Sequence, residues 1–236
     1  MWNIFKKKKE AGFDVQEVAT FVHQFRAPLT AMKWVFEALQ KSKLSAEDQD
    51  MVKTGTQTSE HLSQMVDDIL NLAKLEAGGL EFNFEKINLV TFIEIALNDA
   101  LPVAKAYGVE LLEDHPQEIE INVKADQFKL GMIVSNLIDN AIKYNRPAGS
   151  VTVTMEKKEK EALVSIKDTG IGVPPEALQH LFKKFYRAEN AKASTKKGTG
   201  FGLYIVKEIV EKLGGKIWIE SALNKGTTFY FTLPLA

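Results

Sequence analysis

Apolar side chains recur in alternating steps of three and four residues along the first forty residues of the chain. They are Val15, Val18, Val22, Phe25, Leu29, Met32, Phe36 and Leu39. This spacing is typical of the seam along which a helix packs against other helices, and it predicts a helix over about residues 11–42. Pro28 lies inside the pattern, where its missing backbone donor predicts a kink. His23 follows a seam residue, so we expect it at the edge of the packed face.

A second helix is predicted over about residues 46–76, because Ser45 and the acids that follow it are typical of a helix N-terminus. Its seam residues are Met51, Gly55, Thr58, Leu62, Met65, Ile69 and Leu72. Two long helices with a short connection form an antiparallel hairpin. One hairpin cannot cover its own apolar stripe, so we expect a dimeric four-helix bundle, a homodimer. Gly78 and Gly79 are expected to end the second helix.

Composition limits the classes of function. The 236 residues carry a net charge of -1 and include no cysteine. Disulfides, thiolate zinc sites and cysteine nucleophiles are therefore excluded, which suits a reducing compartment. The charge balance implies no general attraction to nucleic acid, so we expect no nucleic-acid partner.

No apolar run approaches the roughly 20 residues of a transmembrane helix. We expect a cytoplasmic protein, with at most weak contact to the inner membrane face through residues 1–9, where an apolar start precedes four lysines. A frayed basic terminus is the alternative reading of that segment.

From about residue 79 onward, shorter strands and helices follow one another. The predicted strands are 80–87, 109–112, 119–123, 151–155, 162–167, 216–220 and 227–233, and the predicted helices are 90–107, 126–144 and 202–213. The charged run 156–161 is the expected tip of a hairpin. The whole chain is thus predicted to be α+β, a helical hairpin followed by an α/β sandwich with helices on one face of a mixed sheet.

A row of polar side chains lies on one face of the helix 126–144. Asn136, Asn140 and Lys143 step by four and three residues, away from the apolar face. Asparagine offers a neutral oxygen to Mg²⁺ and lysine meets phosphate charge. Tyr144, next in the chain, offers a ring to a base. Taken alone, the row is more simply a solvated polar face.

Two glycine-rich segments change that balance. Asp168-Thr169-Gly170-Ile171-Gly172 follows a predicted strand, and its aspartate can accept a hydrogen bond from an exocyclic amine, which would select adenine over guanine. Gly198-Thr199-Gly200-Phe201-Gly202-Leu203 runs into a helix N-terminus, as phosphate-binding loops do. Neither a Walker loop nor a dinucleotide fingerprint is present. A lone D-x-G-x-G is more often a simple turn.

The order of these segments carries a family resemblance. His23 in the first helix, the asparagine helix, D-x-G-x-G, the aromatic and basic run Phe182 to Arg187 and the final glycine-rich segment follow one another at suitable spacing. Together they resemble the cytoplasmic core of a two-component sensor histidine kinase, over nearly everything from about residue 14. Each motif alone is loose, but five in order are highly specific. The resemblance implies an N-terminal segment 1–13, a dimerisation and phosphotransfer bundle over 14–78, and an ATP-binding domain of the Bergerat (GHKL) type over 79–236.

By position, the resemblance implies a role for each motif residue. His23 would accept the γ-phosphoryl group of ATP at a ring nitrogen, and the group would pass to an aspartate in the receiver domain of a separate response regulator. Asp168 would bind the adenine amine. Mg²⁺ would be held by Asn136. The other implied nucleotide contacts are Asn140 and Lys143 near the phosphates, Tyr144 by the adenine, Gly170 and Gly172 around its pocket, and Arg187 near the outer phosphates. Gly198, Gly200 and Gly202 would frame the lid and the phosphates, and Thr199 and Leu203 would also contact the nucleotide.

Two residues depart from the family pattern. The family usually has an acid directly after the histidine, where a carboxylate can accept the imidazole proton. Gln24 cannot do so, although it can orient the ring or a water, so we expect autophosphorylation with a weaker or different proton acceptor. The family also often has Thr or Asn four residues after the histidine, associated with dephosphorylating the regulator. Ala27 stands there, so we expect little phosphatase activity.

Two other functions stay open at this point. A nucleotide-binding dimeric scaffold, or degraded kinase with little transfer activity, is favoured by Gln24 and opposed by the complete set of nucleotide motifs. Another GHKL ATPase, such as a chaperone or topoisomerase relative, would need an acid to activate water, usually where Asn136 stands. The remaining histidines, His61, His115 and His180, lack the spacing and neighbouring acids of a metal site.

Overall fold

The computed structural model describes residues 15–76, 81–114, 120–193 and 198–236. They divide into two compact units, Met1–Glu81 with Lys197–Thr199, and Phe82–Lys196 with Gly200–Ala236. The predicted membrane-contacting residues 1–9 and the predicted helix end at Gly78 and Gly79 lie outside the described residues. In the described part of the chain, no helix combines the length and hydropathy that crossing a membrane requires.

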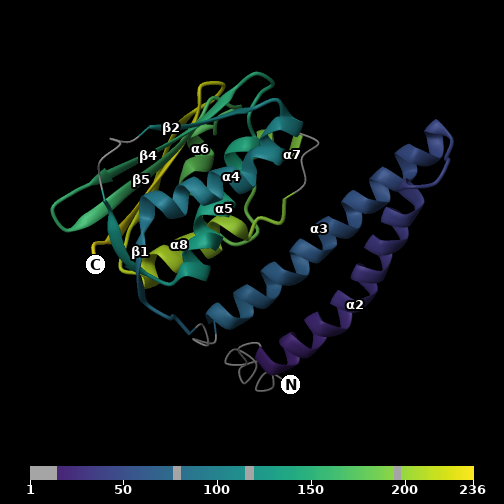
Figure 1. Cartoon of the computed structure of the whole chain (residues 1–236), viewed down its shortest axis with the longest axis horizontal. Helices are drawn as coiled ribbons and strands as arrows, with labels where there is room; N and C mark the ends of the chain where they lie inside the picture. Colours follow the sequence, from purple (N-terminus) through teal and green to yellow (C-terminus); the bar gives the residue numbers. More distant parts are fainter. Residues whose placement is uncertain (1–14, 77–80, 115–119, 194–197) are drawn as a thin grey trace, which may run out of the picture. The chain divides into compact units, whose positions relative to one another are not determined.

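The first unit is the predicted helical hairpin (Figure 1). Helix α2 (Val15–Gln40) runs through Pro28, and helix α3 (Ala46–Glu76) returns beside it. The hydroxyl of Ser45 accepts a hydrogen bond from the amide of Asp48 at 3.1 Å, which caps the start of α3 as the sequence predicts. Both helices therefore form where the apolar spacing places them.

The seam of α2 is split between two faces. Val22 is 2% exposed and Leu29 7%, whereas Phe25 is 45% exposed and Met32 41%. Between Val22 and Met32, every second seam residue thus packs against the neighbouring helix, and the others lie on an exposed apolar stripe. This alternation is what a helix presents when one of its two partners in a bundle is absent.

The predicted seam of α3 is displaced by one residue from the face that packs on α2. Met51 is 67% exposed, while the side chain of the next residue, Val52, is buried. The later buried positions are Ser59, Asp68, Ala73 and Leu75. Ser59 and Ala73 come one residue after the predicted Thr58 and Leu72, and Asp68 comes one residue before the predicted Ile69. Because small and polar residues occupy the packed face, the apolar spacing instead traces the exposed stripe, which includes Ile69.

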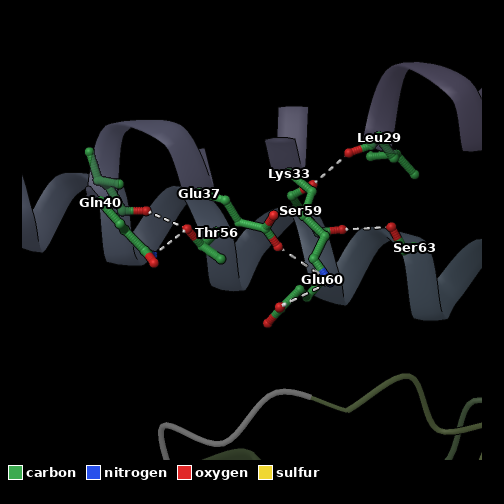
Figure 2. A network of polar contacts seen from close by, with 9 residues as sticks. Leu29, Lys33, Glu37, Gln40, Thr56, Ser59, Glu60 and Ser63 are labelled. Carbon is green, nitrogen blue, oxygen red and sulfur yellow. Dashed lines mark hydrogen bonds and ion pairs between the residues drawn. The ribbon is translucent and has the colours of Figure 1, made fainter. Parts of the chain in front are cut away.

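Polar contacts fix how the two helices align (Figure 2). The buried hydroxyl of Ser59 donates to the backbone oxygen of Leu29 at 3.1 Å, and the Gln40 amide donates to Thr56 Oγ1 at 3.0 Å. Lys33 Nζ lies 3.8 Å from a Glu60 carboxylate oxygen, but this pair is exposed and contributes little stability. Ser59 therefore sets the register more than the ion pair does.

The second unit is an α/β sandwich built on a five-stranded mixed sheet. The strand order is β2-β4-β5-β7-β6, with β2 and β4 parallel and the other pairs antiparallel. Helices α4, α5 and α8 cover one face of the sheet (Figure 1). The bounds are β2 (Glu110–Asp114), β4 (Ser150–Lys157), β5 (Glu161–Asp168), β6 (Ile217–Ala222), β7 (Gly226–Pro234), α4 (Leu89–Tyr107), α5 (Gln127–Lys143) and α8 (Gly202–Lys212). This arrangement confirms the predicted fold class.

The core of the sandwich lies between α5 and the sheet. Ile133, Leu137 and Ile138 of α5 are fully buried, as are Ile166 of β5 and Phe231 of β7. Side chains alternate between buried and part-exposed along β4 and β5, because the helices cover only one face of the sheet. The buried side of α5 fixes which of its residues face away from the core.

Two features at the edges differ from the sequence prediction. The strand predicted over 80–87 begins only at Glu85, as β1 (Glu85–Asn88), which pairs with β3 (Asn122–Ala125). The amide of Asn83 instead donates to the Asp126 carboxylate at 2.7 Å, so it is unavailable for a strand ladder. The short helices α6 (Pro175–Leu178) and α7 (Glu189–Ala193) are not predicted, because they are too short to show a helical period.

Candidate nucleotide and phosphotransfer site

Helix α5 brings its predicted polar residues together on one side. Asn140 Nδ2 donates to Asn136 Oδ1 at 3.0 Å, and both side chains are half-buried. Lys143 ends the helix and Tyr144 caps it, each also half-buried. The opposite side of α5 is buried in the core, so Asn136, Asn140 and Lys143 lie on the side that faces away from it.

The start of α8 meets this row at Asn136. A Cβ placed on Gly202 would overlap the side-chain amide of Asn136. A larger residue at this position would displace the Asn136 side chain, so glycine lets the N-terminus of α8 lie against the asparagine as it is placed here. Leu203 follows in the first turn of α8 and is half-buried.

Asp168 is a buried carboxylate at the end of β5. Its side chain is 5% exposed, and Oδ1 accepts hydrogen bonds from the amides of Gly170 at 2.8 Å and Thr227 at 3.2 Å. Burial raises the pKa of this carboxyl to about 6, against the opposing effect of the two amides. Both amides use Oδ1, so Oδ2 is the oxygen that faces no donor among the described residues.

The loop after Asp168 is wedged between two other segments. A Cβ on Gly170 would overlap the backbone oxygen of Tyr144, and that oxygen accepts a hydrogen bond from the amide of Ile171 at 3.0 Å. Gly172 has a φ of +65°, and a Cβ there would overlap the backbone oxygen of Ala222. The loop and the polar row of α5 therefore meet at Tyr144.

The aromatic and basic run lies against the last glycine-rich segment. Gly200 packs on the backbone of Phe185, and the Phe185 ring contacts that of Phe201 at a centroid distance of 4.5 Å. The guanidinium of Arg187 donates to the backbone oxygen of Ala191 in α7 at 3.1 Å. Gly198 and Thr199 are not part of the compact unit that contains Asp168, so their implied nucleotide contacts stay a prediction.

The proposed phosphoryl acceptor belongs to the other unit. His23 and Gln24 lie in α2, and the Gln24 side chain is exposed to solvent. Ala27, one turn after His23, is also exposed. Both departures from the family pattern thus lie within helix α2.

The donor set at the nucleotide site suits one kind of cation. Among the described residues, no group of three or more His, Cys, Asp and Glu side chains is arranged to hold a metal ion. The paired amides of Asn136 and Asn140 supply neutral oxygens. Mg²⁺ keeps several waters and needs only one or two protein oxygens when phosphates supply the rest. These residues therefore fit Mg²⁺ carried by a nucleotide.

The sequence analysis missed residues of β7 that contact Asp168 and fix its position. The amide of Thr227 binds its carboxylate, and a Cβ on Gly226 would overlap the Asp168 backbone oxygen. The one available signal was Gly226 directly before a predicted strand, which also fits an ordinary turn. Asn145 was missed as well, because a polar residue after a helix end usually contacts only solvent.

Comparisons with protein families match both units. Residues 15–78 match the His Kinase A (phospho-acceptor) domain, and residues 125–236 match the histidine kinase-, DNA gyrase B- and HSP90-like ATPase domain. Sensor histidine kinase WalK of Bacillus subtilis is 36% identical over 222 residues, covering 92% of this chain and 36% of WalK. Sensor protein SrrB of Staphylococcus aureus is 31% identical over 219 residues, covering 92% of this chain and 37% of SrrB. The chain thus spans just over a third of the length of these relatives.

Solved structures share the fold. Full-length ShkA in complex with AMPPNP aligns with a TM-score of 0.75 at 28% identity, covering 94% of this chain and 46% of ShkA. Histidine kinase ThkA in complex with the response regulator TrrA aligns with a TM-score of 0.65 at 22% identity, covering 94% of this chain and 61% of ThkA. At that identity the second likeness shows the fold alone.

Proposed function

Because the chain belongs to the two-component sensor histidine kinases and contains both their phospho-acceptor domain and their ATPase domain, we propose that it is an ATP-dependent protein histidine autokinase. His23 is the proposed acceptor. The phosphoryl group then passes to an aspartate in the receiver domain of a separate response regulator. The observation that carries the nucleotide part is the meeting of the buried Asp168 loop with the polar row of α5 at Tyr144.

The two ends of the nucleotide are assigned from this geometry. Asp168 Oδ2 accepts the exocyclic amine of adenine, beside the Tyr144 ring, while Oδ1 stays bound to its two backbone amides. Asn140 and Lys143 lie toward the phosphates, where the ammonium offsets their charge. Asn136 would hold Mg²⁺, which when bound offsets the charge of the phosphate oxygens. The ShkA structure, solved in complex with AMPPNP, supports nucleotide binding by a protein of this fold.

The chemical step is an exchange of one bond for another. A ring nitrogen of His23 attacks the γ-phosphorus, and the N–P bond forms as the bond to the bridging oxygen breaks and ADP leaves with that electron pair. The imidazole must lose one proton. Gln24 has no basic group to receive it, so the proton passes to water, and the Gln24 amide orients the ring or that water.

The partners follow from the hairpin. The uncovered stripe of Phe25, Met32, Met51 and Ile69 supports a homodimeric four-helix bundle. A receiver domain is the proposed phosphoryl acceptor in trans, and a kinase of the same fold, ThkA, is solved with a response regulator. A cytoplasmic location is part of this proposal, since the ATP it uses is found there.

The decisive experiment incubates the full chain with γ-labelled ATP and Mg²⁺. We expect acid-labile label on the natural chain, none on His23→Gln, and natural labelling on His61→Gln. The last variant is a matched control, because it makes the same change in the other helix of the hairpin. ADP binding is measured on all three proteins.

Each pattern of labels decides between functions. Binding of ADP without label on the natural chain would replace the kinase proposal by the nucleotide-binding dimeric scaffold. Label that survives in His23→Gln would move the acceptor to another residue. Release of inorganic phosphate without a labelled chain would favour a simple ATPase.

A further inference from the structure

Three residues from different segments form a closed ring of hydrogen bonds behind Asp168. Asn145 Nδ2 donates to the backbone oxygen of Ser150 at 2.9 Å. The amide of Ser150 donates to Thr169 Oγ1 at 2.9 Å, and that hydroxyl donates to Asn145 Oδ1 at 3.1 Å. Asn145 is 5% exposed, whereas Ser150 and Thr169 are part-exposed, so the ring is partly shielded from water and leaving the buried Asn145 amide without a partner would be costly.

The ring connects the two halves of the nucleotide site. Asn145 directly follows Tyr144 at the end of α5, and Thr169 directly follows Asp168 at the end of β5. Ser150 is the first residue of β4 and is the third corner. The Asp168 carboxylate and Tyr144 at the end of the polar row are therefore each one residue away from a member of the ring.

The backbone around the ring leaves little room for the Asn145 and Thr169 side chains to be placed differently. A Cβ on Gly149 would overlap Asn145 Oδ1 and would lie 2.7 Å from Thr169 Oγ1, so any other residue there would enter the ring. The Asn145 oxygen also accepts the amide of Arg146 at 3.0 Å. Both polar ends of the Asn145 side chain are thus engaged in keeping three backbone segments in register.

We propose that Asn145 and Thr169 are positioning residues that set the distance between the Asp168 carboxylate and the polar row of α5, and thereby the preference of the site for adenine nucleotides. This inference rests on the proposed function only in that the site binds a nucleotide. A nucleotide bridges both halves of the site, so a shift of a few tenths of an ångström between them weakens its fit at one end. The base end is affected most, because discrimination there depends on the placement of one carboxylate.

The test compares Thr169→Val, which removes the hydroxyl at nearly constant shape, with Thr169→Ser, which keeps it. Affinities of the full chain for Mg·ATP and Mg·GTP are measured by calorimetry, together with kcat and KM for self-labelling. We expect Thr169→Val to weaken ATP binding about tenfold and to narrow the ATP-to-GTP affinity ratio, because both ring hydrogen bonds of the Thr169 hydroxyl are lost. kcat at saturating ATP should stay within about twofold, and Thr169→Ser should behave as the natural chain.

Thr154→Val is the matched control. The Thr154 hydroxyl is hydrogen-bonded to that of Ser165 on the part-exposed side of the sheet, and its loss should leave both affinities unchanged. Asn145→Ala gives a second route, with a larger loss of ATP affinity than Thr169→Val. In the double variant the total loss of binding free energy for ATP should be smaller than the sum of the two single losses, because both changes break the same ring.

Other results would overturn the inference. A Thr169→Val protein that melts at a lower temperature but keeps both affinities and their ratio would show a purely structural ring. Equal effects of Thr169→Val and Thr154→Val would also reject it. A natural chain that binds ATP but does not label itself would refute the kinase function alone, because the affinities still decide the role of the ring. A natural chain that binds no nucleotide would refute both.

Discussion

The two units bury their apolar residues in opposite ways. In the sandwich, the helices and the sheet enclose a full set of buried aliphatic side chains from α4, α5, α8 and β7. In the hairpin, alternate seam residues such as Phe25 and Met32 remain exposed on a long apolar stripe. The sandwich encloses its core within one chain, although Ile95, Leu101 and Phe128 are exposed on it, whereas the hairpin is proposed to be half of a bundle.

This difference matches the chemistry that each unit is proposed to perform. Nucleotide recognition needs a carboxylate and a polar row held at a fixed distance, which a finished core provides. A phosphoryl acceptor must instead meet a kinase site and then a receiver domain, so it belongs on an exposed helix. The comparison therefore predicts that binding and transfer can be lost separately.

The largest expected effect is the loss of nucleotide binding in Asp168→Asn. The new amide would place a donor where the adenine amine also donates, and loss of a charge-assisted hydrogen bond costs about 1.5–3 kcal/mol, up to roughly a hundredfold in affinity. Calorimetry with Mg·ADP measures this, and sedimentation should show an unchanged dimer. A variant that binds ADP normally would contradict the role given to this carboxylate.

The next effect is on assembly and transfer. Met32→Glu combined with Ile69→Glu places charges on the uncovered stripe, so we expect sedimentation to show monomers and self-labelling to fall more than about tenfold. ADP affinity should not change. Lys53→Glu, which alters an exposed charge elsewhere on α3, is the control and should remain dimeric. A double variant that loses ADP binding would break the comparison between the units.

A smaller effect is expected from pH. Since the pKa of Asp168 is raised to about 6 and the adenine amine binds its ionised form, ADP affinity should fall about tenfold for each pH unit below 6. The folded carboxyl binds its proton more tightly than the unfolded one, so its contribution to the free energy of unfolding decreases as pH rises from 3.8 to about 6. Calorimetry between pH 5 and pH 8 measures the affinity. A flat profile in the natural chain, or the same slope in Asp168→Asn, would exclude this carboxyl as the titrating group.

The smallest effect concerns Gln24. Gln24→Glu supplies a carboxylate beside His23 that can accept the imidazole proton, so we expect faster self-labelling. The increase should be smaller than the roughly hundredfold or greater rate enhancement that general bases give in other enzymes. ADP affinity should be unchanged, because Gln24 lies in the hairpin. Single-turnover labelling at saturating ATP measures the rate. An unchanged rate would show that proton removal does not limit transfer.

Sequence periodicity predicted the long elements well because they repeat one pattern many times. Helix α3 runs over the predicted residues 46–76, and α5 and α8 begin and end within two residues of their predicted ends. Periodicity does not predict where an element begins when a single tertiary contact sets its end, nor does it reveal elements that are too short to repeat a pattern. The amide of Asn83 binds Asp126 and delays the start of β1, and α7 has too few residues to show a period.

The candidate site was predictable in its motifs but not in its supports. Asn136, Asn140 and Asp168 stand in recognisable patterns, and the structure places them as a paired amide and a buried carboxylate. Thr227 binds the Asp168 carboxylate from a position far along the chain. Thr169 lies inside the D-x-G-x-G motif at a position where any residue is allowed, and its hydroxyl binds Asn145. Such contacts join residues that are distant in sequence, and a motif within one segment does not show which of them come together.

The place of β7 in the sheet has a consequence for the order of synthesis. This strand follows all others in sequence, yet it lies between β5 and β6 and pairs with both. The sheet therefore cannot close while the chain is still being translated up to β7. The hairpin, made first and held by contacts between neighbouring helices, can fold and find a second copy on the ribosome before either copy has a finished nucleotide site. Pairing of the hairpins can therefore precede completion of the nucleotide-binding sheet.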